Sequence, residues 1–151
     1  MTDHNLDIHE LANALPKGEV VMLTSQALDG RLNARPMLLQ DVDAGGSLWF
    51  FIGRSSSAAE EIKVSHQVAV VHADEAEKRY VALTGKAWLV DDLRRAQDLW
   101  QGDVAHWFPQ GIEDPDLTLL RIDPQTAERW EDGNHHVHLT LAKSQTATTD
   151  G

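Results

Sequence analysis

The chain has 151 residues and a mass of 16.8 kDa, which suits one domain of ordinary size with a real hydrophobic core. Its 24 acidic and 13 basic residues give a formal net charge of −11, which disfavours bulk binding to nucleic acids or anionic membranes. The absence of cysteine excludes a disulfide framework, thiol catalysis and cysteine-ligated metal sites. A polar N-terminal segment and short apolar runs predict a soluble, cytoplasmic protein, with one domain over residues 1–142 and a disordered tail over residues 143–151.

The first quarter of the chain predicts a short helix followed by a β-hairpin. Apolar residues recur at helical spacing over residues 7–15. Residues 19–26 and 31–40 have strand composition, and the Asp29-Gly30 pair between them is typical of a hairpin turn. Pro36 stands in the middle of the second strand and cannot donate a ladder hydrogen bond. That strand is therefore predicted to lie at a sheet edge or to be bulged at the proline.

Residues 47–53 form the most hydrophobic predicted strand, and apolar residues occupy both of its faces. We expect the core to cover one face and a partner or ligand to cover the other. Phe50 and Phe51 follow Trp49 directly in this strand, and an exposed patch of that kind normally marks a partner surface. The strand therefore predicts a homodimer.

A serine-rich segment follows this strand. The run Ser55-Ser56-Ser57 precedes a predicted helix, and Ser57 together with Glu60 matches a capping box. Unpaired backbone N–H groups at a helix start favour an anion, and Arg35 and Arg54 could reach the same place. The segment is therefore either a phosphate site or a plain serine-capped helix, and the residues alone favour the capped helix.

Most of the remaining chain has strand character. The predicted strands cover residues 66–73, 79–90, 117–122 and 128–130. Gly85 is a predicted bulge, and the Asp123-Pro124 pair separates the last two strands. Asp91 is predicted to cap an acidic amphipathic helix that extends to about residue 101. Six or seven strands joined mainly by tight turns favour an antiparallel barrel.

Three histidines near the C-terminus are the main metal candidates. His135, His136 and His138 lie together, and on a strand the side chains of His136 and His138 point to one side. A stable divalent site needs a third or fourth ligand, so a solvated strand end is favoured for this cluster.

The sequence has no glycine-rich nucleotide-binding motif and no nucleophile elbow. Tyr80 and His72 carry titratable side chains near the predicted strands but are better explained as structural residues, so no catalytic residue is predicted.

The order of several motifs gives the chain a family likeness over roughly residues 11–131. These motifs are Gly30-x4-Arg35-Pro36-Met37, Leu48-Trp49-Phe50-Phe51, the serine-rich helix start ending in Glu60-Glu61-Ile62, Arg79-Tyr80-Val81-x3-Gly85-x-Ala87, Trp107-Phe108-Pro109-x-Gly111, Asp114-Pro115-Asp116-Leu117 and Ala127-Glu128-x-Trp130. With them the chain resembles the flavin-binding split-barrel superfamily. More narrowly, it is similar to the general stress protein branch labelled pyridoxamine 5′-phosphate oxidase-related.

The resemblance implies a mainly β fold, a six-stranded antiparallel Greek-key split barrel with a few peripheral helices. It also implies a homodimer with FMN, or FAD in some members, in clefts at the dimer interface. Arg35, Pro36 and Met37 would lie beside the flavin ring and phosphate. The strand end Phe51-Ile52-Gly53 would run along the cofactor. Ser55 and Ser57 would meet the phosphate.

Two positions depart from the family pattern. Ala58 stands where members commonly carry a lysine that pairs with the flavin phosphate. Loss of such a charge-assisted contact costs about 1.5–3 kcal/mol, or roughly ten- to a hundredfold in affinity. Gln40 occupies the place of the lysine that holds the substrate phosphate in true pyridoxamine phosphate oxidases. Oxidation of vitamin B6 is therefore rejected as the reaction.

The sequence leaves three functional hypotheses open. The leading one is an FMN-binding protein of the general stress type that acts as a flavin-dependent oxidoreductase on an unknown substrate. The second is a cofactor-free homodimeric stress or binding protein that has lost the phosphate contact at Ala58. The third is a barrel that binds heme through one of its histidines.

Overall fold

The computed structural model describes residues 8–101, 104–131 and 135–140. The expected tail over residues 143–151 and the predicted domain end at residue 142 lie outside these residues. The helices are α1 (Ile8–Asn13), α2 (Ser57–Val64), α3 (Leu93–Leu99) and α4 (Val104–Trp107). The strands are β1 (Val20–Gln26), β2 (Leu32–Leu38), β3 (Asp41–Val42), β4 (Leu48–Gly53), β5 (Gln67–Asp74), β6 (Arg79–Val90), β7 (Leu117–Glu131) and β8 (His135–Thr140).

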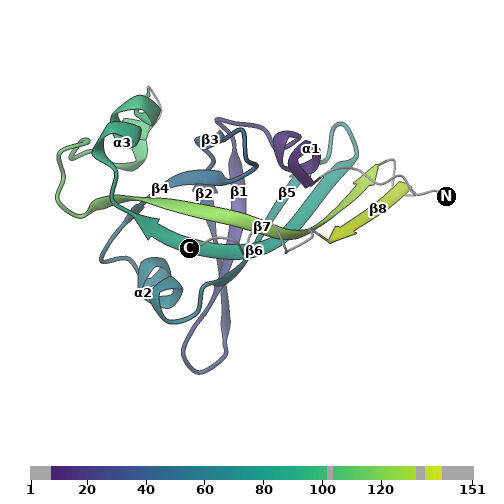
Figure 1. Ribbon diagram of the computed structural model, residues 1–151, viewed down its shortest axis with the longest axis horizontal. Helices are drawn as coiled ribbons and strands as arrows, with labels where there is room; N and C mark the ends of the chain where they lie inside the picture. The colour runs from purple at the N-terminus through teal and green to yellow at the C-terminus, as the bar shows by residue number, and fades with distance from the viewer. Residues whose placement is uncertain (1–7, 102–103, 132–134, 141–151) are drawn as a thin grey trace.

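The strands form one antiparallel sheet, in the order β2-β1-β5-β6-β7-β4-β3, and β8 pairs with β7 beyond this path (Figure 1). Strands β5, β6 and β7 make a meander, and β4 returns to lie beside β7, which is a Greek-key arrangement. The predicted mainly β, antiparallel fold is confirmed. The described part of the chain has eight strands where six were expected, because the two-residue β3 and the C-terminal β8 extend the sheet.

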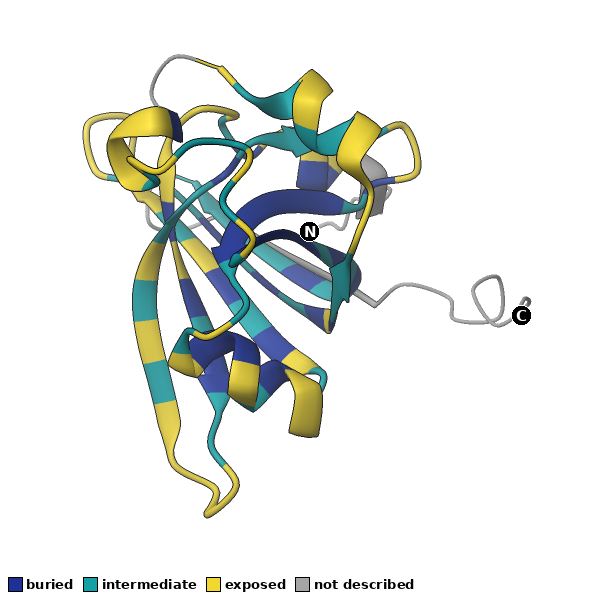
Figure 2. Cartoon of the chain, turned by 90° about the vertical axis from the view of Figure 1, so that its left-hand side faces the viewer, coloured by how far each residue is buried: buried dark blue, intermediate teal, exposed yellow. Residues whose placement is uncertain are grey.

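The sheet curls around the main hydrophobic core. Its inward-facing side chains include Leu23, Val70, Leu83 and Leu120, each at most 1% exposed. Helix α1 contributes Leu11 and Ala12 to this core, and α2 contributes Ala59 and Ile62. Figure 2 shows α2 below the curled sheet with its buried side toward the strands. The position of α2 matters for the site described below because Glu61, in its second turn, reaches the β1–β2 hairpin.

A second cluster covers the other face of β4. Trp49 and Phe51 pack there with Val104 of α4, and Trp100 and Phe108 close over them. The Phe51 ring meets the Trp100 ring edge to face at a centroid distance of 5.3 Å. The chain itself thus buries both faces of β4, one in the main core and the other in the second cluster. The expectation that a partner or ligand covers one of them is wrong, because α3, α4 and the following loop fold back over the strand.

Two predictions from proline and glycine are confirmed. Strand β2, with Pro36 at its middle, is an edge strand of the sheet. The β6–β7 register shifts between Thr84 and Gly85, which is the predicted bulge. The predicted break at Asp123-Pro124 is wrong, since β7 runs without interruption through both residues. Pro124 lies opposite Gly85 at the bulge, where a missing N–H donor is tolerated.

The predicted helix caps are each displaced by one residue. Ser56, not Ser57, is the N-cap of α2, and its hydroxyl accepts a hydrogen bond from the Ala59 N–H. Asp92, not Asp91, is the N-cap of α3, and its carboxylate accepts from the Arg95 N–H. Within the described ranges, no helix is long and apolar enough to cross a membrane.

Candidate functional site

Arg35 belongs to a polar cluster between the β1–β2 hairpin and α2 that is centred on Glu61. Its Nη1 donates to the Ser25 hydroxyl at 2.7 Å, and its Nη2 lies 3.5 Å from Oε1 of Glu61. The Glu61 carboxylate also accepts from Ser25 Oγ and from Asn33 Nδ2, each at 2.6 Å. Both charged side chains are largely buried, 21% and 13% exposed. One carboxylate of α2 therefore gathers three polar side chains of the hairpin.

The cluster leaves part of Arg35 available for a ligand. A guanidinium has five N–H donors, and Arg35 uses two of them in these contacts. Ser57 precedes Glu61 by four residues on α2, so it lies on the same helix face, and it is exposed. The remaining Arg35 donors and the Ser57 hydroxyl are the groups suited to an anion here, and the position of the missing lysine, Ala58, is buried in the main core.

The cluster also makes the free energy of unfolding depend on pH. The hydrogen bond from Ser25 lowers the pKa of Glu61 below its ordinary value of 4.5, and Asn33 and Arg35 lower it further against the opposing effect of burial. A carboxylate with a depressed pKa stabilises the fold above its unfolded pKa, and this contribution is lost as the pH falls through the folded pKa.

We therefore expect Glu61→Gln to reduce the free energy of unfolding by about 1–2 kcal/mol at pH 7, because the charge-assisted bonds weaken. The difference from the unmodified protein should shrink as the pH falls below about 4.5. Urea unfolding at several pH values measures this. Glu60→Gln is the matched control, since Glu60 is exposed and pairs only with Lys63 at 3.4 Å within the described structure. Equal losses in the two variants would contradict the assignment.

The other residues of the predicted site lie in different surroundings. Pro36 is exposed on the outer face of β2, whereas Met37 points inward and packs against the main core. Ile52 is buried in that core, and Phe51 is buried in the second cluster. Gly53 approaches the carboxylate of Asp116, so closely that a Cβ there would lie 2.9 Å from its Oδ2.

The three serines have three different roles. Ser55 donates its N–H and its hydroxyl to the two oxygens of the Asp116 carboxylate, each at 3.0 Å. Ser56 caps α2 and donates to the Gly53 carbonyl at 2.7 Å. Ser57 is exposed in the first helical turn. The two donors of Ser55 thus bind an anionic group, but that group is the Asp116 carboxylate of the chain itself and not an external ligand.

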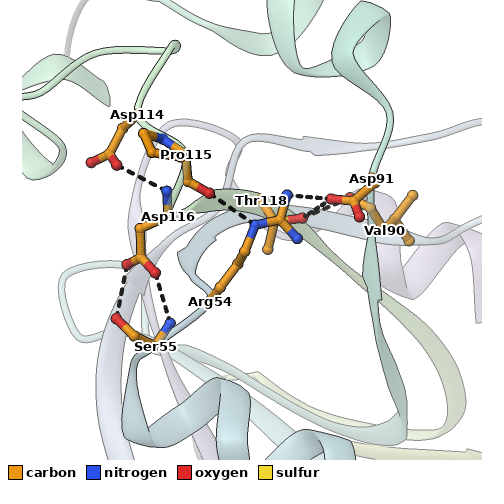
Figure 3. A network of polar contacts seen from close by, with 8 residues as sticks. All are labelled: Arg54, Ser55, Val90, Asp91, Asp114, Pro115, Asp116 and Thr118. Atoms are coloured by element: carbon orange, nitrogen blue, oxygen red, sulfur yellow. Dashed lines mark hydrogen bonds and ion pairs between the residues drawn. The ribbon is translucent and has the colours of Figure 1, made fainter.

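Arg54 belongs to a separate network (Figure 3). Its Nε donates to the Pro115 carbonyl at 3.0 Å, and its Nη2 pairs with Oδ1 of Asp91, which also accepts from the Thr118 hydroxyl. The hydrogen bond from Arg54, and then that from Thr118, lowers the pKa of Asp91. The same contact raises the pKa of Arg54. Arg35 and Arg54 share no partner among the described residues, so the expectation that both reach one place is not met by these contacts.

Sequence reasoning missed Glu61 and Asp116, the two carboxylates that hold the predicted donors. Glu61 stands four residues after Ser57, which was a usable signal for a shared helix face. Asp116 is 61 residues from Ser55, and no local pattern predicts that contact.

Two open cavities of the described structure lie near these elements. A groove of about 960 Å³ lies between the β2–β3 connection and α3, and Gln40 and Arg95 are among its lining residues. A cavity of about 350 Å³ lies between α3 and the ends of β4, β6 and β7. Within the described residues, no group of three or more metal-ligating side chains is placed to hold an ion. The side chains of His135, His136 and His138 lie outside what is described, although the backbone of β8 pairs with β7.

Comparison with known protein families gives one match over almost the whole chain. The model of a family described as pyridoxamine 5′-phosphate oxidase like matches residues 6–150. A search among proteins of curated function finds no match.

Solved structures with the same fold include proteins named for general stress. The general stress FMN/FAD binding protein from Xanthomonas citri is 28% identical, with a TM-score of 0.68, and the match covers 89% of this chain and 92% of that chain. A Clostridium acetobutylicum protein related to general stress protein 26 is 20% identical, with a TM-score of 0.73 and coverage of 90% and 97%. A heme binding protein from Mycobacterium smegmatis is 14% identical, with a TM-score of 0.70 and coverage of 91% and 59%. The last two likenesses show the fold alone.

Proposed function

Since the chain belongs to the pyridoxamine 5′-phosphate oxidase-like family, we propose that it binds a flavin, FMN in the first place and FAD as the alternative. The observation that carries the proposal is the Xanthomonas citri protein, which is described as FMN/FAD binding and matches this chain along nearly its whole length. We further propose a flavin-dependent oxidoreductase whose substrate is not vitamin B6, because Gln40 cannot form an ion pair with a substrate phosphate.

The residues present fit the phosphate end of such a ligand. Arg35 has donors that its described contacts leave unused, Ser57 is exposed one turn before Glu61 on α2, and the first N–H groups of a helix favour an anion. Among the described strands β2 pairs only with β1, so one row of its backbone groups has no described strand beside it, and Pro36 and Met37 lie on this edge strand. A bound flavin would supply the electron-transfer chemistry, and these residues would hold and orient it.

A homodimer is part of this proposal, and the outer face of the β2-β1-β5 edge supports it. Val20, Met22 and Val71 are each 41–43% exposed there, and Leu32 is 69% exposed. Met22 pairs in register with both Pro36 and Val71, so these apolar side chains adjoin one another across three strands. Monomeric proteins seldom leave such a patch in water.

Light scattering at micromolar concentration should give about twice the chain mass of 16.8 kDa. Met22→Asp should shift the protein toward the monomer, because a desolvated carboxylate would face the partner. Glu77→Asp, at another exposed position, is the control substitution. A monomer mass for the unmodified chain would refute the dimer.

Titration of the refolded protein with FMN tests the flavin proposal directly. Refolding removes cofactor carried through purification, so quenching of flavin fluorescence reports the affinity itself. We expect saturable quenching in the micromolar range or tighter, and at least about tenfold weaker binding in Arg35→Ala, since one charge-assisted contact is lost.

Arg31→Ala is the matched control, because Arg31 lies on the same hairpin and pairs with Asp29 alone in the described structure. Arg35→Lys guards against a folding defect, since it keeps a charge opposite Glu61. An absence of quenching up to millimolar FMN would overturn the proposal and favour the cofactor-free homodimer.

A further inference from the structure

The cavity beside α3 has the size and lining of a ligand site. Its volume is about 350 Å³, within the range of small-molecule sites. The walls are mainly apolar and come from five parts of the chain: Phe51 of β4, Val90 of β6, Ala96 of α3, Ile112 of the segment before β7, and Leu117 and Leu119 of β7. The α3 cavity, as we call it, shares no residue with the cluster around Arg35 and Glu61.

Helix α3 covers this cavity without filling it. None of its residues is buried. Leu93, which lines the cavity, is 65% exposed, and Ala96 is only partly buried. The apolar stripe predicted for this helix is therefore present but incompletely covered, and a ligand in the cavity would remove more of it from water.

The opening of the cavity carries an excess of negative charge. Asp91, Asp92 and Arg54 all line it. Oδ1 of Asp91 accepts from both Arg54 and Thr118, while its Oδ2 has no partner in the described structure (Figure 3). Asp92 uses Oδ1 to cap α3, and its Oδ2 likewise has no described partner. Two carboxylates against one guanidinium leave a net negative charge, with two free acceptor oxygens.

We propose that the α3 cavity binds a small amphipathic amine. Its apolar or aromatic body lies between α3 and Phe51, and its ammonium group lies at Asp91 and Asp92. An anionic ligand is disfavoured, because Arg54 already has its ion pair and the two carboxylates would repel a third. The cavity shares Phe51 with the strand end expected along the flavin but none of the groups proposed to hold the flavin phosphate, so either proposal can fail without the other.

Titration of the full-length protein with 2-phenylethylamine tests the proposal. Binding is followed by methyl NMR shifts of the leucine and isoleucine residues and by the fluorescence of Trp100, whose ring adjoins Phe51. We expect saturation at millimolar concentrations or below, with shifts confined to the cavity walls. Phenylacetate, with the same ring and the opposite charge, should bind at least about tenfold more weakly.

Two variants test separately how the cavity and the negative charge contribute to amine binding. Ala96→Leu fills the cavity, and Asp91→Asn removes the charge while keeping an acceptor for Arg54 and Thr118. Each should weaken amine binding at least about tenfold. Ala105→Leu on α4 and Asp98→Asn on α3 are the matched controls, since neither lines this cavity. Equal binding of the amine and the carboxylate, no effect of Ala96→Leu, or no saturation by about 10 mM amine would each overturn the proposal.

Discussion

Replacing Gly85 with alanine is expected to lower the thermal unfolding midpoint by roughly 6–12 °C, for a cost of about 3 kcal/mol. The cost arises because β6 and β7 cross closely at the bulge. A Cβ on Gly85 would lie 2.3 Å from the Asp123 carbonyl oxygen and 2.9 Å from the Pro124 Cα. Both are backbone atoms, so no side chain can rotate away and the two strands themselves must separate.

The same substitution should also weaken two hydrogen bonds that Gln67 makes at the bulge. Gln67 donates to the Gly85 carbonyl at 3.1 Å and to the Gln125 side chain at 3.0 Å. Gln125 is the extra residue of the bulge, because Gly85 pairs with Pro124 and Thr84 pairs with Thr126. Separation of the strands would therefore weaken both contacts.

Gly45→Ala is the matched control for this prediction. Gly45 lies in the turn before β4, and an added Cβ would meet only the Asp43 carboxylate, at an ordinary 3.5 Å. Its midpoint should stay within about 2 °C of that of the unmodified protein. Calorimetry of both variants decides the matter. Similar midpoints for the two would show that the close approach at Gly85 carries no particular cost.

Features set by local backbone chemistry could be predicted from the sequence. Pro36 placed β2 at an edge because proline lacks a donor, and Gly85 marked the bulge because only glycine fits a close approach. The same rule misled at Pro124, since a proline within a bulge does not end a strand. The local sequence predicted Asp91 as a helix cap, but its carboxylate forms an ion pair with Arg54, 37 residues away, instead of capping the helix. A local sequence pattern cannot predict such a long-range ion pair.

Of the candidate site, the sequence predicted only the hydrogen-bond donors and not the carboxylates that accept from them. Arg35 and the serines were predicted as anion-binding groups, and the structure gives Arg35 and Ser55 each a carboxylate neighbour within the chain. Those neighbours, Glu61 and Asp116, follow from how α2 packs under the hairpin and how residues 114–118 return to β4. The prediction of a partner surface from β4 failed for the same reason. Periodicity shows that a face must be covered, and it does not show which part of the chain covers it.

Ala58→Lys is expected to tighten FMN binding by roughly ten- to a hundredfold, which corresponds to about 1.5–3 kcal/mol for a restored charge-assisted contact. Ala58 is the second residue of α2, beside the exposed Ser57 and one turn from the Arg35 cluster. An ammonium group there would meet the phosphate that we propose Arg35 and Ser57 hold.

The same substitution should make the flavin-free protein less stable. Ala58 is 5% exposed within the main core, so the longer side chain must displace neighbours or extend toward solvent. A cation near a helix N-terminus is also unfavourable, by about 0.3–1 kcal/mol. Added FMN should restore the lost stability by mass action, so affinity rises while the unfolding midpoint without ligand falls.

Ala105→Lys distinguishes the effect of a contact at Ala58 on FMN affinity from the effect of a change in the net charge of the protein. Ala105 is exposed on α4, and its replacement adds the same positive charge to a chain of net charge −11. If the affinity gain came only from reduced repulsion of the phosphate, both variants would show it equally. A gain confined to Ala58→Lys would place the flavin phosphate at the start of α2, because only there does the new ammonium group act at contact distance.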